Sequence, residues 1–536
     1  MCYDDSILQK GVSVVKESKE ARRKRQRKSG LVIGSLRFLL YGGLLALFIA
    51  VMSIRNWYLL NPSRTLAIVL FTWFGMTAAM HSAYGGYDVG RKKSKPIIGN
   101  MALGTFITDG VTYFALQIMN VNVNNNDTLE LFGLDFVLLM LCYLLQLILI
   151  AVMVKLGNEL FFRINPPRDC LIILGDLTNQ EAIEKKISRY RLQWHITDVA
   201  RWDDPDLNSR IEKVAVVFMA NIPEEVRLKL MRICYDLHRD VLCKAQMQDI
   251  IMSNARQVVV DDAPFLEMDY HKTTFGQRSV KRLMDIGVSL TALVLLSPLL
   301  LVIAICIHLE DGGPVMFYQK RTTGDGSEFT ICKFRTMRLE REEDKKLPTA
   351  VNDDRVTRIG RFLRRFRLDE LPQFYNILIG DMSLVGPRPE MLENVDRYKL
   401  ALPTFVYREK MKAGLTGLAQ IEGRYNTSPE DKLMLDLMYI ESFNIWMDIK
   451  LILRTFTVFF KPESTAGFTD QQELDMQAQD SVLAEQRSAA AESELRAAQT
   501  ESAPKSKTRQ SAPARASGRK KARHTKHQKN SISKAS

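Results

Sequence analysis

Four long apolar stretches near the N-terminus constrain the fold of this chain more than any other feature. They cover residues 31–54, 65–84, 98–119 and 131–154. Each approaches or exceeds the ~20 residues that an α-helix needs to cross the hydrocarbon core of a bilayer. The third stretch is the weakest, because it contains Asp109; an ionisable group at that depth is often functional, but it can also mark the end of an interfacial helix. The sequence predicts a unit of four transmembrane helices over residues 31–155.

The charges between these stretches predict how the unit is oriented. Residues 21–28 read ARRKRQRK and residues 90–95 read GRKKSK, whereas residues 120–130 contain no positive charge. Because basic loops stay on the cytoplasmic side, both ends of the unit should face the cytoplasm. We therefore predict a membrane protein with a basic cytoplasmic N-terminus over residues 1–30. Four buried helices of a soluble domain are the alternative, which the alternation of charge disfavours.

Residues 163–262 alternate between short apolar runs and a helix-like segment. The runs CLIIL (170–174) and VAVVFM (214–219) predict buried strands, residues 223–238 predict a helix, and residues 258–260 resemble a third strand. This alternation predicts a small, doubly wound, Rossmann-like α/β insert. The GxGxxG fingerprint of dinucleotide-binding domains is absent, which favours a spacer or assembly role over nucleotide binding.

A fifth apolar run, over residues 281–310, is interrupted by Ser297 and Pro298. Proline removes a backbone donor and bends or breaks a helix, and the Ser297 hydroxyl could satisfy the freed carbonyl. A kinked span would carry the next segment across the membrane, whereas a helix that breaks and returns would keep it cytoplasmic. The cytoplasmic character of the Arg- and Lys-rich segment that follows favours a re-entrant membrane helix over residues 283–308.

The ends of the chain carry most of its formal net charge of +13. The tail over residues 470–536 is basic from 502 onward and has almost no large apolar side chain there, so that part should be disordered. The N-terminal basic run is better explained by contact with anionic lipid than by nucleic-acid binding. The seven cysteines form no CxxC pair, which argues against a zinc site.

The polar chemistry is densest over residues 353–390. Asp369 and Glu370 follow a run of closely spaced arginines: Arg355, Arg358, Arg361, Arg364, Arg365 and Arg367. A helix is expected over 371–379, and the Gly-Pro-Arg-Pro loop at 386–389 would hold Arg388 in a fixed direction. Guanidinium groups pair with phosphate oxygens, and Mg²⁺ takes few protein oxygens and relies on substrate phosphates. The pattern suits a diphosphate bound with Mg²⁺; a salt-bridged surface helix is the alternative for the acidic pair alone.

Ordered motifs over residues 280–462 make the interpretation specific. They are KR (281–282), SP (297–298), GPV (313–315), KFRTM (333–337), LDELPQ (368–373), GDMSLVGPRP (380–389) and GLTG (414–417). This set resembles the catalytic domain of the bacterial sugar transferases, the polyprenyl-phosphate hexose-1-phosphate transferases also called monotopic phosphoglycosyl transferases. The predicted domain over 275–462 would be a mixed α/β catalytic domain, and the N-terminal half resembles the large members of that family. One departure is Ala413, where the family often has proline before its glycine turn.

The resemblance implies roles for matching residues. Asp369 would be the nucleophile, and Glu370 would assist it, with both carboxylates as Mg²⁺ ligands. Substrate phosphate would be bound by Arg364, Arg388, Arg355, Lys333 and Arg335. Gln420 and Arg424 would shape the nucleotide pocket. The substrates would be a UDP-sugar and polyprenyl (undecaprenyl) phosphate, in the first membrane step of exopolysaccharide, capsule or O-antigen synthesis through a covalent phospho-sugar aspartyl intermediate.

A non-catalytic reading is the alternative: a membrane scaffold that senses nucleotide-sugars through its insert and recruits polysaccharide machinery. The intact Arg, Asp and Glu set argues against it. The family resemblance makes UDP-glucose and UDP-galactose the leading candidates for the sugar donor. The sequence leaves open which sugar is transferred, which polysaccharide results, what the insert and tail do, and whether the chain forms a homodimer.

Overall fold

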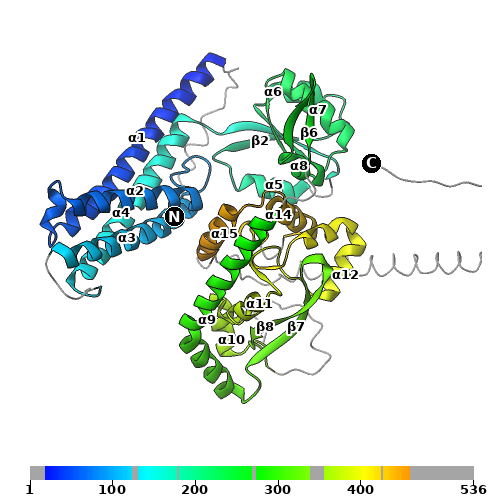
Figure 1. The fold of residues 1–536 in the computed structure, drawn as a ribbon. Helices are drawn as coiled ribbons and strands as arrows, with labels where there is room; N and C mark the ends of the chain where they lie inside the picture. The colour runs from blue at the N-terminus through cyan, green and yellow to red at the C-terminus, as the bar shows by residue number, and fades with distance from the viewer. Residues whose placement is uncertain are drawn as a thin grey trace, which may run out of the picture. The chain divides into compact units, whose positions relative to one another are not determined.

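The structure is a computed structural model that describes residues 19–123, 131–177, 180–268, 273–338, 355–423 and 427–458. Two compact units divide the chain, Met1–Thr469 and Asp470–Ser536. All described residues belong to the first unit, so the predicted tail lies outside them. In chain order this unit contains long apolar helices, a parallel sheet with helices, and a mixed α/β region (Figure 1).

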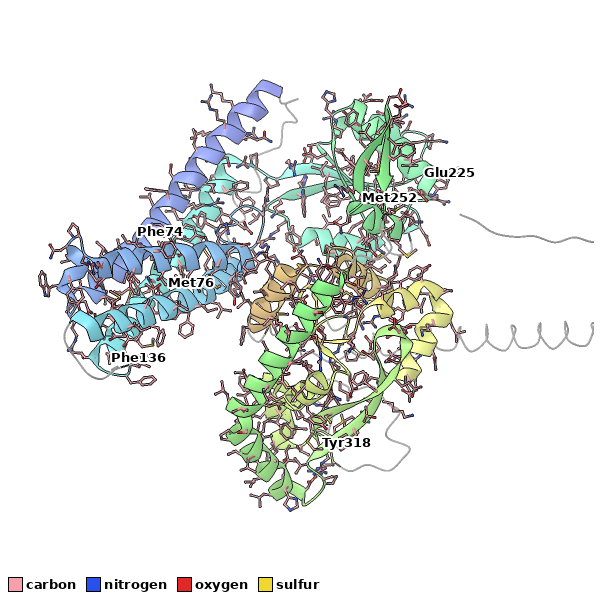
Figure 2. The ribbon with its side chains drawn as sticks, viewed as in Figure 1. Phe74, Met76, Phe136, Glu225, Met252 and Tyr318 are labelled. Carbon is pink, nitrogen blue, oxygen red and sulfur yellow. The ribbon has the colours of Figure 1, made fainter. Side chains whose placement is uncertain are left out.

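The predicted apolar helices near the N-terminus are confirmed. They are α1 (Lys19–Met52), α2 (Arg64–Tyr84), α3 (Ser94–Val123) and α4 (Leu134–Ile164), with a short 3₁₀ turn, η2 (Trp57–Leu60), after α1. By length and composition, α1, α2 and α4 are apolar enough to cross a membrane, whereas α3 is not among the candidates. Large apolar side chains remain exposed on them, such as Phe71 and Phe74 of α2. Figure 2 labels Phe74 on this helix. An outer surface of this kind fits lipid better than water.

The α/β segment contains a four-stranded parallel sheet in the order β2-β1-β3-β4. Its strands are β1 (Arg168–Leu174), β2 (Trp194–Arg201), β3 (Val216–Ala220) and β4 (Asp240–Cys243). Its helices are α5 (Gln180–Ser188), α6 (Leu207–Lys213), α7 (Glu224–Asp236) and α8 (Met247–Ser253). Leu171 and Ile173 of β1 pack in one cluster with residues of α6 and α7. Ile172 and Leu174 pack in another with Ile187 of α5, so helices cover both faces of the sheet.

The strand expected at 258–260 belongs to a different sheet. It lies in β5 (Arg256–Val260), which pairs antiparallel with β6 (Ala263–Glu267) as a separate hairpin. Strands β2 and β4 were not anticipated. β2 alternates partly buried and exposed residues, and β4 has four residues that are all only partly buried. Neither therefore shows the continuous apolar run that marks a buried strand.

The fifth apolar run forms a single helix, α9 (Phe275–Asp311), with Pro298 inside it. Its direction changes part-way along its length (Figure 1). Pro298 has no N–H group, so it cannot donate the helical hydrogen bond to the Val294 carbonyl. The Ser297 hydroxyl donates to that carbonyl instead, at 2.8 Å. The helix thus bends without being interrupted, and the predicted return to the same side of the membrane stays a prediction.

On α9, polar side chains are buried and apolar side chains are exposed, which is the reverse of the pattern in a helix of a water-soluble protein. Lys281, Asp285 and Ser289 are buried, whereas Leu283 and Leu295 are 69% and 72% exposed. The N-terminus is fixed by a capping box between Thr274 and Gln277, and the C-terminus by Gly312 at φ 68°. The helix therefore presents an apolar surface outward and polar groups to the catalytic region.

The rest of the predicted catalytic domain, called the catalytic region below, follows α9 directly. Its strands are β7 (Met316–Thr322) and β8 (Glu328–Phe334), which are antiparallel, and β9 (Ser383–Val385) and β10 (Gly414–Thr416), which are parallel. Its helices are α10 (Arg358–Phe366), α11 (Gln373–Ile379), α12 (Leu392–Ala401), α13 (Leu418–Glu422), α14 (Pro429–Glu441) and α15 (Ile445–Val458), with 3₁₀ segments η4 (Gly324–Gly326), η6 (Leu368–Glu370) and η7 (Pro403–Lys410). One apolar cluster, which includes Ile331, Ile377, Leu384, Phe405 and Leu437, holds these elements together.

Candidate active site

The acidic pair lies in the short turn η6 between two helices. Helix α10 ends at Arg367, whose φ of 54° is in the left-handed region that non-glycine residues seldom adopt. The chain then forms η6, which contains Asp369 and Glu370, and continues into α11. The turn fixes both carboxylates at the junction of α10 and α11 and not on the face of a regular helix. A strained backbone position of this type is typical of functional sites.

Glu370 is surrounded by basic groups. Its Oε1 lies 3.3 Å from Lys333 Nζ and 3.1 Å from Arg388 Nη2, and its Oε2 lies 4.0 Å from Arg367 Nη1. Burial alone would raise the pKa of Glu370, but these three cations outweigh it and hold that pKa well below its usual range. Glu370 is therefore a carboxylate over the whole working pH range.

Asp369 has the opposite electrostatic setting. Burial, followed by the charge of Glu370, raises the pKa of Asp369, while Lys333 and Arg364 act against the rise. Arg364 is oriented by a hydrogen bond from its Nε to Thr336 Oγ1 at 2.8 Å. Two neighbouring carboxyl groups whose environments give them different pKa values can serve different functions in catalysis. Asp369 is the more basic of the two and is the better candidate for a nucleophile.

A close backbone approach positions the loop that carries Arg388. A glycine directly follows each of the strands β9 and β10, and a Cβ atom at Gly386 would lie 2.2 Å from the Lys412 carbonyl oxygen. A Cβ at Gly417 would lie 2.2 Å from the carbonyl oxygen of Gly386. Only glycine, which has no Cβ atom, allows two backbone segments to approach this closely. The Arg388 carbonyl also accepts a hydrogen bond from Arg408 Nη2 at 2.8 Å, so the loop is held from both sides.

A small polar cavity of about 230 Å³ lies at the centre of these groups. It is lined by Arg321, Ile331, Lys333, Glu370, Gln373, Arg388, Pro389, Gly414, Leu415 and Gln420. Three of these side chains are basic and one is acidic. Burial, with the nearby charge of Arg388, lowers the pKa of Arg321 to about 10. The excess of positive charge in a partly enclosed space favours an anion with more than one charge.

The structure brings most, though not all, of the predicted site residues together. Lys333, Glu370, Arg388 and Gln420 line the cavity. Asp369 is next to Glu370 in the chain, and the charge of Lys333, which lines the cavity, lowers the pKa of Asp369. Arg364 also lowers the pKa of Asp369 and so lies near the same carboxyl group.

Two predicted residues have other placements, and a third lies outside the described residues. Arg335 forms an ion pair with Asp311 at the end of α9 and does not line the cavity. Arg355 is also outside the lining, and its carbonyl accepts a hydrogen bond from the Arg338 N–H at 2.9 Å. Arg424 is outside the described residues.

Two lining residues with polar side chains, Arg321 and Gln373, were not predicted as site residues. Arg321 is half-buried in β7, and its Nη2 donates to Gln319 Oε1 at 2.6 Å. Gln373 is the first residue of α11 and is 3% exposed. Gln373 belongs to the LDELPQ motif, which was the available signal, but neither that motif nor the sequence around Arg321 shows that these side chains share a cavity with Glu370.

The donor set is compatible with Mg²⁺ held jointly by protein and substrate. Among the described residues there is no group of three or more His, Cys, Asp or Glu side chains with metal-ligand spacing. Mg²⁺ commonly uses one or two carboxylates together with substrate phosphates. Asp369 and Glu370 supply the two carboxylates; Lys333 and Arg388 contact Oε1 of Glu370, and Oε2 has only the longer contact of 4.0 Å to Arg367 among the described residues.

Comparison with known proteins identifies the family. The family model described as bacterial sugar transferase matches residues 276–462. A UDP-glucose:undecaprenyl-phosphate glucose-1-phosphate transferase of Caulobacter vibrioides is 41% identical over 180 residues, which are 33% of this chain and 67% of the relative. This chain belongs to the bacterial sugar transferase family. The catalytic region described above, including the acidic pair and the Gly-Pro-Arg-Pro loop, lies within the matched residues.

Longer relatives match over the same region. A UDP-glucose:undecaprenyl-phosphate glucose-1-phosphate transferase of Klebsiella pneumoniae is 45% identical over 180 residues, 33% of this chain and 39% of the relative. A UDP-N-acetylgalactosamine-undecaprenyl-phosphate N-acetylgalactosaminephosphotransferase of Aeromonas hydrophila is 41% identical over 179 residues, 33% of this chain and 42% of the relative. The match thus spans about two fifths of the length of these two relatives. Family members with similar catalytic regions are named for different sugars.

Proposed function

We propose that this membrane protein transfers a hexose-1-phosphate from a UDP-sugar to polyprenyl phosphate, with undecaprenyl phosphate as the carrier. The observation that supports this most directly is the partly enclosed polar cavity in which Lys333, Arg388 and Arg321 accompany Glu370. A diphosphate carries enough negative charge to pair with these cations. The relatives' names describe transfer from UDP-sugars to undecaprenyl phosphate. The reaction would begin the assembly of exopolysaccharide, capsule or O-antigen.

The proposed chemistry has two displacements at the same phosphorus. The Asp369 carboxylate attacks the β-phosphorus of the donor, a P–O bond to the α-phosphate breaks, and UMP leaves with that electron pair. The hexose-1-phosphate is then joined to Asp369 as an acyl phosphate. An oxygen of polyprenyl phosphate attacks the same phosphorus, Asp369 leaves as a carboxylate, and a diphosphate-linked lipid sugar is released.

The other residues stabilise charge during these steps. Lys333 and Arg388 neutralise the diphosphate and keep Glu370 ionised, while Arg364 lies near the attacking carboxylate. Mg²⁺ bound by Asp369, Glu370 and the substrate would supply further neutralisation of the phosphate oxygens. Gln420, which lines the cavity, is proposed to contact the nucleotide; the same role is proposed for Arg424.

The membrane arrangement is part of the proposal. The exposed apolar side of α9 would lie in the lipid, and its bend at Pro298 would return the chain to the cytoplasmic face of the inner membrane. The water-soluble donor and the lipid phosphate could then both reach the cavity. A purely scaffolding role is not favoured, because a scaffold has no need for a buried acidic residue with three basic partners.

The deciding experiment is a donor panel with the full-length protein in lipid. UDP-glucose, UDP-galactose and N-acetylated UDP-sugars are supplied with undecaprenyl phosphate and Mg²⁺, and release of UMP is measured. Asp369→Asn should abolish release, because an amide cannot act as the nucleophile. Asp396→Asn, the same change at an exposed position of α12, should leave the rate unchanged. A phospho-sugar adduct on Asp369, trapped with donor alone, is expected by mass spectrometry; full activity of Asp369→Asn would refute the assigned role.

A further inference from the structure

Three polar atoms of the cavity lining have no hydrogen-bond partner in the described part of the chain. They are Arg321 Nε, Gln373 Nε2 and Gln420 Oε1. Each is buried, and a buried polar atom without a partner is uncommon in folded proteins because it loses its contact with water and gains nothing. Their presence in a single cavity indicates that a ligand supplies the missing partners.

Gln373 is the most informative of the three, because it is uncharged and almost fully buried. Only 3% of its surface is exposed, yet its amide nitrogen donates to no protein atom in the described residues. The same helix provides a contrast in Asn376, whose amide is saturated. Asn376 Nδ2 donates to the Thr330 carbonyl at 2.8 Å, and Asn376 Oδ1 accepts from the Cys332 N–H at 2.9 Å. Asn376 therefore joins α11 to β8, whereas the Gln373 amide nitrogen makes no such connection.

We propose that Gln373 is a donor-substrate-binding residue whose side-chain amide donates a hydrogen bond to an oxygen of the diphosphate. This inference rests on the proposed function. Gln373 shares the cavity with Arg321, Lys333 and Arg388, the cations expected to hold the same diphosphate. These cations attract the diphosphate from any direction, whereas a hydrogen bond from a neutral N–H group forms only with an oxygen at the right distance and close to the N–H axis. The amide therefore orients the diphosphate. The role is to bind and orient the donor, and the lipid phosphate is not its ligand.

The energetic consequence separates this role from a structural one. Replacing a buried donor that has no protein partner removes no protein hydrogen bond, so it should not weaken the fold. Removing its bond to a charged ligand should weaken donor binding by roughly tenfold or more. A structural glutamine would behave in the opposite way, with a lower melting temperature and an unchanged affinity.

The test compares Gln373→Met, Gln373→Glu and Asn376→Leu in the full-length protein. The readouts are the melting temperature, the rise in melting temperature on adding UDP, and the KM values for donor and lipid phosphate. Gln373→Met should melt at or above the wild-type temperature, should lose most of the stabilisation by UDP, and should raise the donor KM about tenfold with the lipid KM unchanged. Gln373→Glu should be worse than Gln373→Met, because its charge repels the diphosphate.

Asn376→Leu should instead lower the melting temperature, since it removes both connections between α11 and β8. The proposal is overturned if Gln373→Met melts lower and keeps the wild-type response to UDP, or if Gln373→Glu binds UDP as well as the wild type does. Failure of the proposed function would look different. The wild-type protein would release no UMP from any donor, and the role of Gln373 would then be decided by the UDP-induced change in melting temperature alone.

Discussion

Replacing Lys281 with methionine should destabilise the catalytic region strongly, although Lys281 is far from Asp369 in the sequence. Lys281 Nζ lies 2.6 Å from Asp448 Oδ2 and donates to the Val385 carbonyl at 2.9 Å. Asp448 is 0% exposed and also accepts a hydrogen bond from the Tyr439 hydroxyl at 2.7 Å. These bonds join the start of α9 to α15 and to the end of β9, one residue before Gly386 of the active-site loop.

The size of the effect follows from what the substitution leaves behind. Methionine preserves the length of the side chain but leaves the Asp448 carboxylate buried, with Tyr439 as its one remaining side-chain donor among the described residues. Breaking a buried ion pair by removing one partner costs about 3–5 kcal/mol. For a region of this size, that corresponds to a fall in melting temperature of roughly 6–20 °C. The double variant Lys281→Met with Asp448→Asn removes both charges and should recover most of the loss.

The deficit should also depend on pH. Burial raises the pKa of Asp448, and Lys281 acts against that rise. Without Lys281 the pKa of Asp448 should be higher still, so the folded variant binds a proton that the unfolded chain does not. A carboxyl group whose pKa is raised by folding stabilises the fold at low pH and loses that contribution as the pH rises through the raised pKa. The deficit of Lys281→Met should therefore be smaller at pH 5 than at pH 8.

Thermal and urea denaturation of the full-length protein in detergent measure this directly. Lys320→Met is the matched control, because Lys320 forms an exposed pair with Glu328 at 3.3 Å that should contribute less than about 1 kcal/mol. A deficit for Lys281→Met no larger than that of the control, or a double variant less stable than the single one, would refute the reasoning.

Three further predictions concern the active site. Lys333→Met should move the acid limb of the rate profile to higher pH, because Lys333 lowers the pKa of Asp369 and a nucleophilic carboxylate must be ionised; an unmoved limb in a pH series would contradict this. Gly386→Ala should cost roughly 1–3 kcal/mol or more, since its Cβ would lie 2.2 Å from the Lys412 carbonyl oxygen; denaturation curves measure it, and a variant as stable as wild type would count against the close approach. Chelation by EDTA should stop UMP release and added Mg²⁺ should restore it, whereas activity that persists in EDTA would exclude the proposed use of Mg²⁺.

Local features of the sequence were sufficient for the membrane helices and for part of the site. A bilayer helix is specified by length and apolar composition, so α1, α2, α4 and α9 could be anticipated without any knowledge of their neighbours. The helix expected at 371–379 is present as α11, preceded by η6. Asp369, Glu370 and Arg388 could be selected because they lie close together in one motif-rich segment, and the structure places Arg388 3.1 Å from Glu370.

Pairing between distant segments could not be predicted in the same way. The strand at 258–260 was assigned to the parallel sheet, yet it pairs with β6 in a hairpin, because strand partners depend on tertiary packing and not on a local pattern. Arg335 resembled a phosphate ligand in the sequence, but the fold places it beside Asp311.

The sequence by itself determined that this chain has long apolar helices and a region with the chemical groups of a bacterial sugar transferase, because hydrophobic length and residue type are properties of the string. The tertiary structure alone decided which groups meet. It placed Arg321 and Gln373 in the cavity with Glu370, and it buried Lys281 against Asp448, 167 residues away. Electrostatic and hydrogen-bond energies depend on distance and burial, and both are fixed only when separate segments pack together.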